Sequence, residues 1–122
     1  MHTEQIKNIE KELENYESEL YECSAEYRHL ATDAATKRAA YDVRWAQELL
    51  KIATNKDLKL TVPEKEAMVT TLVQDELSAC RIAEAMASGS KERLKALQAN
   101  LTSVQTRASL LKTARSLVNM MS

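Results

Sequence analysis

Residues 6–34 read IKNIEKELENYESELYECSAEYRHLATDA, and this stretch decides the fold. Its apolar side chains recur at alternating steps of three and four residues, which is the spacing of one helix face in a coiled coil. The first 62 residues contain neither Gly nor Pro, so no strong helix breaker interrupts this pattern. The stretch therefore predicts a long amphipathic helix that packs along a second helix. The apolar face comprises Ile6, Ile9, Leu13, Tyr16, Leu20, Cys23, Tyr27, Leu30 and Ala34.

The composition of the whole chain also favours helices over sheets. The 122 residues include one Gly, one Pro and no Phe, so few residues are available to form turns. Doubly wound folds, barrels and sandwiches need many turns and are excluded. Hydrophobic residues make up 44% of the chain and charged residues 29%, a balance that argues against a disordered protein. We expect an all-α protein that forms a single elongated helical domain over residues 1–122.

One segment divides the chain into two helices. It begins with the polar residues 55–57, and Thr61 and Glu64 then stand at the spacing of a capping box, with Pro63 in the first helical turn. We predict a helix over about residues 3–54, a turn over about 55–61 and a second helix over about 62–119. Gly89 is the position at which the second helix would bend or approach another helix closely.

The apolar pattern of both helices predicts a coiled-coil-like antiparallel hairpin. Because the helices join near residue 58, residue i would lie near residue 116 − i, and acidic residues 10–26 would face basic residues 91–107. Further apolar residues such as Met68 and Leu72 lie off this face, so we expect the hairpins to assemble into a helical-bundle homo-oligomer. The main residues of the predicted core seam are Leu13, Leu20, Val73, Leu94, Leu97, Leu101, Val104 and Leu111.

The sequence offers no constellation typical of an enzyme. Cys23 and Cys80 are 57 residues apart, and neither has a His at a metal-ligand spacing, so we expect free thiols and no metal site. His29 stands alone, and no Gly-rich phosphate loop exists in a chain with one Gly. We expect no catalytic residue and no cofactor. An acidic amphipathic start and the lack of a long apolar run predict neither a secretory signal nor a membrane span, hence a cytoplasmic protein.

The charge of −1 hides an uneven distribution. Residues 1–30 carry eight acidic and three basic side chains, whereas residues 91–122 carry one acidic and six basic side chains. Near the predicted hairpin tip, basic residues alternate with two aromatic residues, a mixture typical of single-stranded nucleic-acid binding. Tyr41 and Trp45 fit a helical core equally well, and this alternative stays open at this point. The candidate nucleic-acid-binding residues are Lys37, Arg38, Tyr41, Arg44, Trp45, Lys51, Lys56 and Lys59.

The layout of three segments resembles that of the phage recombination mediators related to UvsY. These segments are YDVRWAQELL at residues 41–50, LTVPEKEA at residues 60–67 and LKALQANLTSVQT at residues 94–106. The resemblance covers about residues 38–111 and rests on pattern and spacing, whereas the first 37 residues have no part in it.

The resemblance implies a ring-forming or otherwise oligomeric helical protein that binds single-stranded DNA. Such a protein helps to load a recombinase onto strands coated by single-strand-binding protein, inside the bacterial host cell. Basic residues near the tip would carry the strand, and here these are Lys51, Lys56 and Lys59, with Arg44 close by.

A second hypothesis explains the same helices without nucleic acid. In this hypothesis the chain is a helical-hairpin interaction adaptor, an assembly chaperone or a structural coiled coil that binds other helices along its apolar face. It accounts for the heptad pattern and for charge pairing between the two helices equally well.

Overall fold

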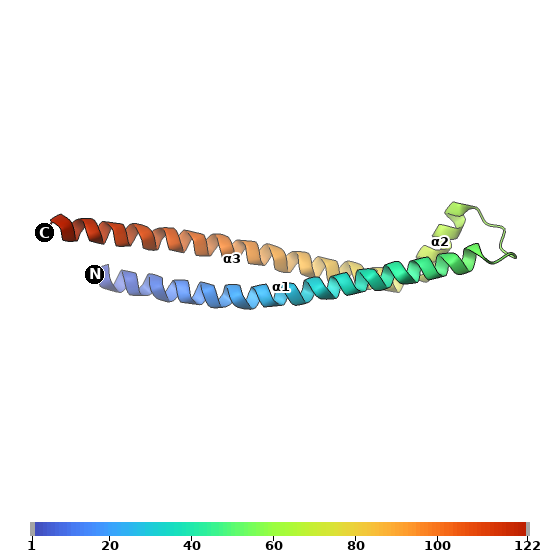
Figure 1. Cartoon of the computed structure of the whole chain (residues 1–122), viewed down its shortest axis with the longest axis horizontal. Helices are drawn as coiled ribbons and strands as arrows, with labels where there is room; N and C mark the ends of the chain where they lie inside the picture. Colours follow the sequence, from blue (N-terminus) through green and yellow to red (C-terminus); the bar gives the residue numbers. More distant parts are fainter. Residues whose placement is uncertain (1, 122) are drawn as a thin grey trace. The chain divides into compact units, whose positions relative to one another are not determined.

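The computed structural model describes residues 2–121 and consists of three helices. Helix α1 spans His2–Ala53, α2 spans Val62–Leu72 and α3 spans Gln74–Met121 (Figure 1). Helices account for 92% of the described residues, which contain no strand, and this confirms the all-α prediction. No helix within this range has the length and apolarity needed to cross a membrane.

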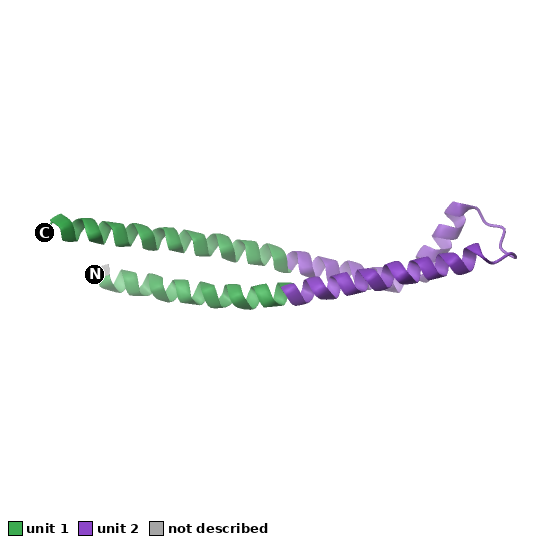
Figure 2. Ribbon diagram, viewed as in Figure 1, with its two compact units in different colours: residues 1–27, 90–122 green, residues 28–89 purple. Residues whose placement is uncertain are grey.

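The chain divides into two compact units, coloured separately in Figure 2. Unit 1 comprises Met1–Tyr27 and Ser90–Ser122, of which residues 1 and 122 lie outside the described range. Unit 2 comprises Arg28–Gly89. Each unit therefore combines a part of α1 with a part of α3, and unit 2 also contains α2.

Ion pairs show that the two long helices are antiparallel within each unit. In unit 1, Glu12 pairs with Arg107 at 3.2 Å and Glu26 with Arg93 at 3.7 Å. The expected pairing of acidic residues 10–26 with basic residues 91–107 is thus present. The partners lie three residues farther along α3 than the relation 116 − i predicts.

The ion pairs of unit 2 also show antiparallel helices, and their partners on α3 are likewise shifted from the positions that the relation 116 − i predicts. Arg44 pairs with Glu76 and Arg38 with Glu84, four and six residues beyond the predicted positions. The shift arises because the chain does not reverse in a tight turn at residue 58. Instead, the reversal takes up the whole segment between Ala53 and Gln74, including α2.

The start of α2 follows the capping pattern of the sequence. Thr61 has an extended backbone (φ −71°, ψ 163°), and its hydroxyl accepts a hydrogen bond from the Glu64 backbone N–H at 3.4 Å. The Glu64 carboxylate accepts a 2.8 Å bond from that same hydroxyl, whereas a capping box would direct it to the Thr61 backbone N–H. Pro63 stands in the first turn, where its missing N–H costs nothing.

The prediction of one continuous helix over 62–119 is wrong at Val73. This residue separates α2 from α3 with φ −105° and ψ 17°, values outside the α-helical region. Figure 1 shows that α2 leaves the axis of α3 at this point. Val69 and Val73 both pack against Ile52 of α1 at the bend.

Gly89 is an ordinary helical residue inside α3. Its φ is negative, and a Cβ built on it would meet no heavy atom within 4 Å. The expected close helix contact at Gly89 is therefore absent from the described structure, and α3 continues through this position.

The buried core consists of small side chains. Eight described residues are buried, all of them Cys, Ala, Val or Ile. Among the predicted seam residues, Val73 and Val104 are buried, whereas the leucines of the seam are partly exposed. These partly exposed leucines are Leu13, Leu20, Leu94, Leu97, Leu101 and Leu111.

Candidate functional site

The tip of unit 2 is built around a small hydrophobic cluster. Ile52 of α1 packs against Val69 of α2 and Val73, which joins α2 to α3, so the cluster holds all three helices together. Val69 and Val73 are completely buried, and Ile52 is 6% exposed. Partly buried side chains surround the cluster, and these are Tyr41, Trp45, Leu49 and Leu58.

Tyr41 and Trp45 thus belong to the core side of α1. Both are partly buried and pack against the cluster of Ile52, Val69 and Val73. The guanidinium carbon of Arg38 lies 5.8 Å from the centre of the Tyr41 ring, within range of a cation–π contact. Part of each ring is therefore covered by the chain itself, and part remains exposed.

Arg44 connects α1 to α3 instead of extending into solvent. Its Nε donates to Glu48 Oε1 at 3.1 Å, one turn away on the same helix. Its Nη1 donates to Glu76 Oε1 at 2.9 Å, in the first turn of α3. Two carboxylates within the protein therefore balance the positive charge of Arg44, although its side chain is 43% exposed.

The carboxylate of Glu48 also accepts a hydrogen bond from Lys51. Lys51 Nζ donates to Glu48 Oε1 at 3.2 Å, and this bond lowers the pKa of the Glu48 carboxyl below its ordinary value, with a further contribution from Arg44. The side chain of Lys51 remains 73% exposed. Because Lys51 is largely solvated, its ion pair with Glu48 contributes little to stability.

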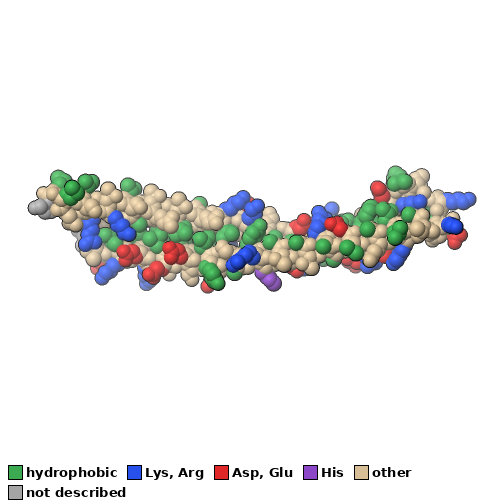
Figure 3. Space-filling view, in the orientation of Figure 1, with side chains coloured by type: hydrophobic (Ala, Val, Ile, Leu, Met, Phe, Trp, Pro, Cys, Tyr) green, Lys and Arg blue, Asp and Glu red, His purple; other side chains and the backbone are tan. Residues whose placement is uncertain are grey.

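Lys37 and Arg38 are also paired. Lys37 Nζ lies 3.0 Å from Asp33 Oδ2 on the same helix, and Arg38 Nη2 lies 3.8 Å from Glu84 Oε1 on α3. Both pairs are between 42% and 48% exposed, so they contribute little to stability. Their effect is to mix acidic with basic side chains along this surface, as the space-filling view shows (Figure 3).

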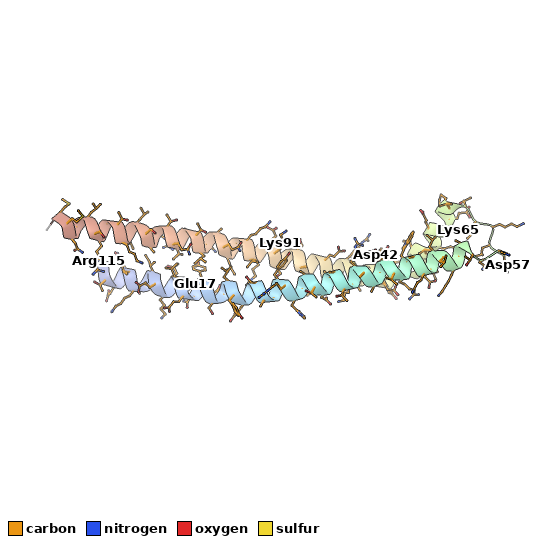
Figure 4. The ribbon with its side chains drawn as sticks, in the orientation of Figure 1. Glu17, Asp42, Asp57, Lys65, Lys91 and Arg115 are labelled. Atoms are coloured by element: carbon orange, nitrogen blue, oxygen red, sulfur yellow. The ribbon has the colours of Figure 1, made fainter. Side chains whose placement is uncertain are left out.

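Lys56 and Lys59 differ from the other six candidates. Both are exposed in the segment between α1 and α2, and neither forms an ion pair with any residue in the range 2–121. Asp57 lies between the two lysines in the sequence and extends from the same loop (Figure 4). Lys65 lies on α2, next to this loop. The structure thus narrows the predicted basic patch to two unpaired lysines with one neighbouring acid.

Cys80 is a buried thiol that contacts a carboxylate of its own helix. Its Sγ lies 3.2 Å from Glu84 Oε1, to which the thiol donates. Burial raises the pKa of the Cys80 thiol, and the Glu84 carboxylate raises it further. Cys23 is also buried and free. Within the described range, no three His, Cys, Asp or Glu side chains are grouped so that they could hold a metal ion.

The basic residues at the end of the chain are partly neutralised in unit 1. Arg93 and Arg107 pair with glutamates of α1, and Lys95 lies 3.5 Å from Glu92 on its own helix. Both arginines therefore have a glutamate partner in the acidic part of α1.

Comparison with known proteins gives no relative. No family model, no curated protein and no solved structure matches the chain.

The sequence pattern does not indicate the partners of two carboxylates on α3. Glu76 interrupts the apolar seam of α3, and the structure shows that it receives Arg44 from α1. Glu84 receives both the Cys80 thiol and Arg38. A carboxylate within an apolar seam is itself a signal for a basic partner on the facing helix, and the shifted register explains why the partner could not be named.

Proposed function

We propose that this chain is a non-enzymatic helical protein that acts as a homo-oligomer. The observation that carries the proposal is its surface. The chain exposes 9114 Å², whereas a compact monomer of its mass exposes roughly 6,600 Å². The difference of about 2,500 Å² exceeds the ~800 Å² that each partner contributes to a standard interface.

The small core supports the same proposal. No Leu, Met, Tyr or Trp is fully buried among the described residues, and the largest completely buried side chains are valines. Thirteen large hydrophobic side chains are exposed in the described structure, among them Leu50 at 65%, Ile82 at 62% and Met86 at 54%. A chain of this size needs more buried apolar surface to be stable, and further helices would supply it.

The charge of each unit favours a second copy over a strongly charged partner. Unit 1 contains nine acidic and eight basic residues, and unit 2 contains nine of each. Copies of a nearly neutral chain do not repel each other, and net charge near zero promotes association.

Light scattering coupled to size-exclusion chromatography tests the proposal. We expect a mass that is a multiple of 13.7 kDa at micromolar protein concentration. A mass of 13.7 kDa at all concentrations, from a cooperatively folded protein, would contradict it. That result would favour the alternative of an adaptor that binds the helix of another protein.

Binding of single-stranded DNA is a second candidate function, favoured by Lys56 and Lys59. Two unpaired lysines per subunit would bind phosphates weakly, and an oligomer would add these contacts by multivalency. The resemblance to the UvsY-related mediators supports this candidate and extends it to recombinase loading on strands coated by single-strand-binding protein, in the interior of a bacterial host cell. Because Tyr41 and Trp45 pack against the cluster at the tip, this candidate relies on phosphate contacts of the two lysines.

Fluorescence anisotropy of a labelled poly-dT strand tests this candidate. We expect salt-sensitive binding that the double variant Lys56→Glu, Lys59→Glu weakens, with a salt slope reduced by about 0.7 for each lost phosphate contact. The matched control is Lys91→Glu, Lys95→Glu, which makes the same charge change on α3 in unit 1. Absence of binding at low salt, or equal loss in both variants, would contradict a loop-specific site.

A further inference from the structure

The end of unit 1 is helical but almost without a core. No residue in the described ranges 3–22 and 105–121 is buried, although both ranges are helical throughout. The last buried residues before this end are Cys23 on α1 and Val104 on α3. Helices of this length need an apolar face packed against other elements, because helix propensity alone gives little stability. This end of the unit therefore lacks part of its packing.

The final turns of α3 carry a second apolar stripe beside the seam that faces α1. We use the name terminal stripe for Leu110, Ala114, Leu117 and Met121, which follow one another at steps of four and three. A helix turns by about 100° per residue, so this stripe is rotated by roughly a quarter turn from Leu111 and Val104. Leu110, Leu117 and Met121 are 65%, 56% and 87% exposed. Hydrophobic side chains gather at this end of the molecule in Figure 3.

Together, the seam that faces α1 and the terminal stripe form an apolar face on α3 that is wider than one antiparallel partner requires. A helix in a two-stranded coiled coil has a narrow apolar seam, whereas a helix in a larger bundle has a wider apolar face that contacts two neighbours. The seam of α3 contacts α1, and the terminal stripe is left for another helix pair. A groove of about 510 Å³ follows its edge between α1 and α3, lined by Gln5, Asn8, Ile9, Glu12, Arg107, Leu110 and Leu111.

The rim of this groove indicates which partner fits. Gln5 and Asn8 are uncharged, and the two charged residues, Glu12 and Arg107, pair with each other at 3.2 Å. In a two-fold interface the same surface meets itself, so an unbalanced charge there would repel its own copy. A groove with an apolar floor and internally matched charges carries no net charge that would oppose its own copy.

We infer that the terminal stripe and its groove dock the same surface of a second copy, so that two unit 1 helix pairs form a four-helix bundle. This inference rests on the proposed homo-oligomer and names the surface that forms it. The packing would bury Leu110 and Leu117 against the equivalent residues or against Ile9 of the other copy, and would cover the turns of α1 and α3 that lack a core.

Paired substitutions and light scattering test the inference. The variant Leu110→Gln, Leu117→Gln removes the apolar stripe without adding charge, and Gln is a good helix former. The matched control is Val43→Gln, Leu50→Gln, two side chains on α1 in unit 2 with 57% and 65% exposure. Leu110→Met, Leu117→Met keeps the stripe apolar. We expect the first variant to fall to 13.7 kDa at the concentration at which the wild type is assembled. The control and the Met variant should keep the wild-type mass.

The outcomes separate the two proposals. An assembled wild type whose mass does not change with Leu110→Gln, Leu117→Gln would overturn the terminal interface and leave the homo-oligomer intact. Equal loss of mass in the control pair would also overturn the assignment to the terminal stripe. A monomeric wild type would overturn the homo-oligomer itself. Helicity measured by circular dichroism shows that each variant is folded.

Discussion

Arg44 Nη1 donates a 2.9 Å hydrogen bond to Glu76 Oε1 and thereby joins α1 to the first turn of α3. This pair links two residues 32 positions apart at the point where the chain leaves α2. It explains both a basic residue that the sequence pattern associated with nucleic acid and an acidic residue that interrupts the apolar seam.

A double-mutant cycle of Arg44→Ala and Glu76→Ala measures this contact. Both side chains are more than a third exposed, at 43% and 34%, so we expect a coupling free energy of about 0.5 kcal/mol from urea unfolding. The Arg44→Lys variant should recover only a part of it, because Lys lacks the fork that reaches Glu48 and Glu76 together. A coupling energy of zero would show that the bond has no role in aligning the helices.

Val69 should be the most sensitive position of α2. Its side chain is 0% exposed and packs against Ile52 and Val73. Val69→Ala removes two buried carbons and leaves a cavity, so it should lower the free energy of unfolding by about 2 kcal/mol. Val62→Ala, on the same helix but 66% exposed, is the control, and its effect should stay within about 0.5 kcal/mol. Similar losses in the two variants would contradict a core at the tip.

Trp45 provides an optical test of the tip, because it is the single tryptophan of the chain. Since it packs against the cluster of Ile52, Val69 and Val73, unfolding should shift its emission to longer wavelength. Saturating poly-dT should leave the emission unchanged even where the loop lysines bind the strand. Quenching that saturates with the strand would show base stacking and would contradict a core position.

Cys80 makes stability depend on pH at the alkaline side. The folded protein holds the pKa of this thiol above its ordinary value through burial and through Glu84, so the unfolded chain ionises first, near pH 8.5. The stabilising effect is complete below that pH and is lost as the pH rises through it toward the folded pKa. The free energy of unfolding should therefore fall more steeply between about pH 8 and 10 in the wild type than in Cys80→Ala. Parallel pH profiles would contradict a protonated, buried thiol.

The sequence predicts the helices well because their causes are local. The repeat from Ile6 to Ala34 and the absence of Gly and Pro predict α1 to within one residue at each end. Thr61, Pro63 and Glu64 predict the start of α2, because a cap depends only on residues three apart.

The missed features depend on contacts between distant segments. Val73 fits a helical seam, and the sequence gives no signal for the backbone change by which α2 ends at this residue. Trp45 fits both a core and a binding face in the sequence, and its packing against the cluster at the tip appears only in the structure. The register of Glu12 with Arg107 depends on how many residues the reversal takes up, which no local pattern specifies.

The concentration dependence of thermal unfolding tests the central claim most directly. If the exposed helix faces are covered by other copies, unfolding is coupled to dissociation, and mass action raises the midpoint as the protein concentration rises. We predict an increase of several degrees in the circular dichroism midpoint over roughly a hundredfold range of concentration. A midpoint that does not change over this range would contradict the account, because the chain would then be stable without a second copy.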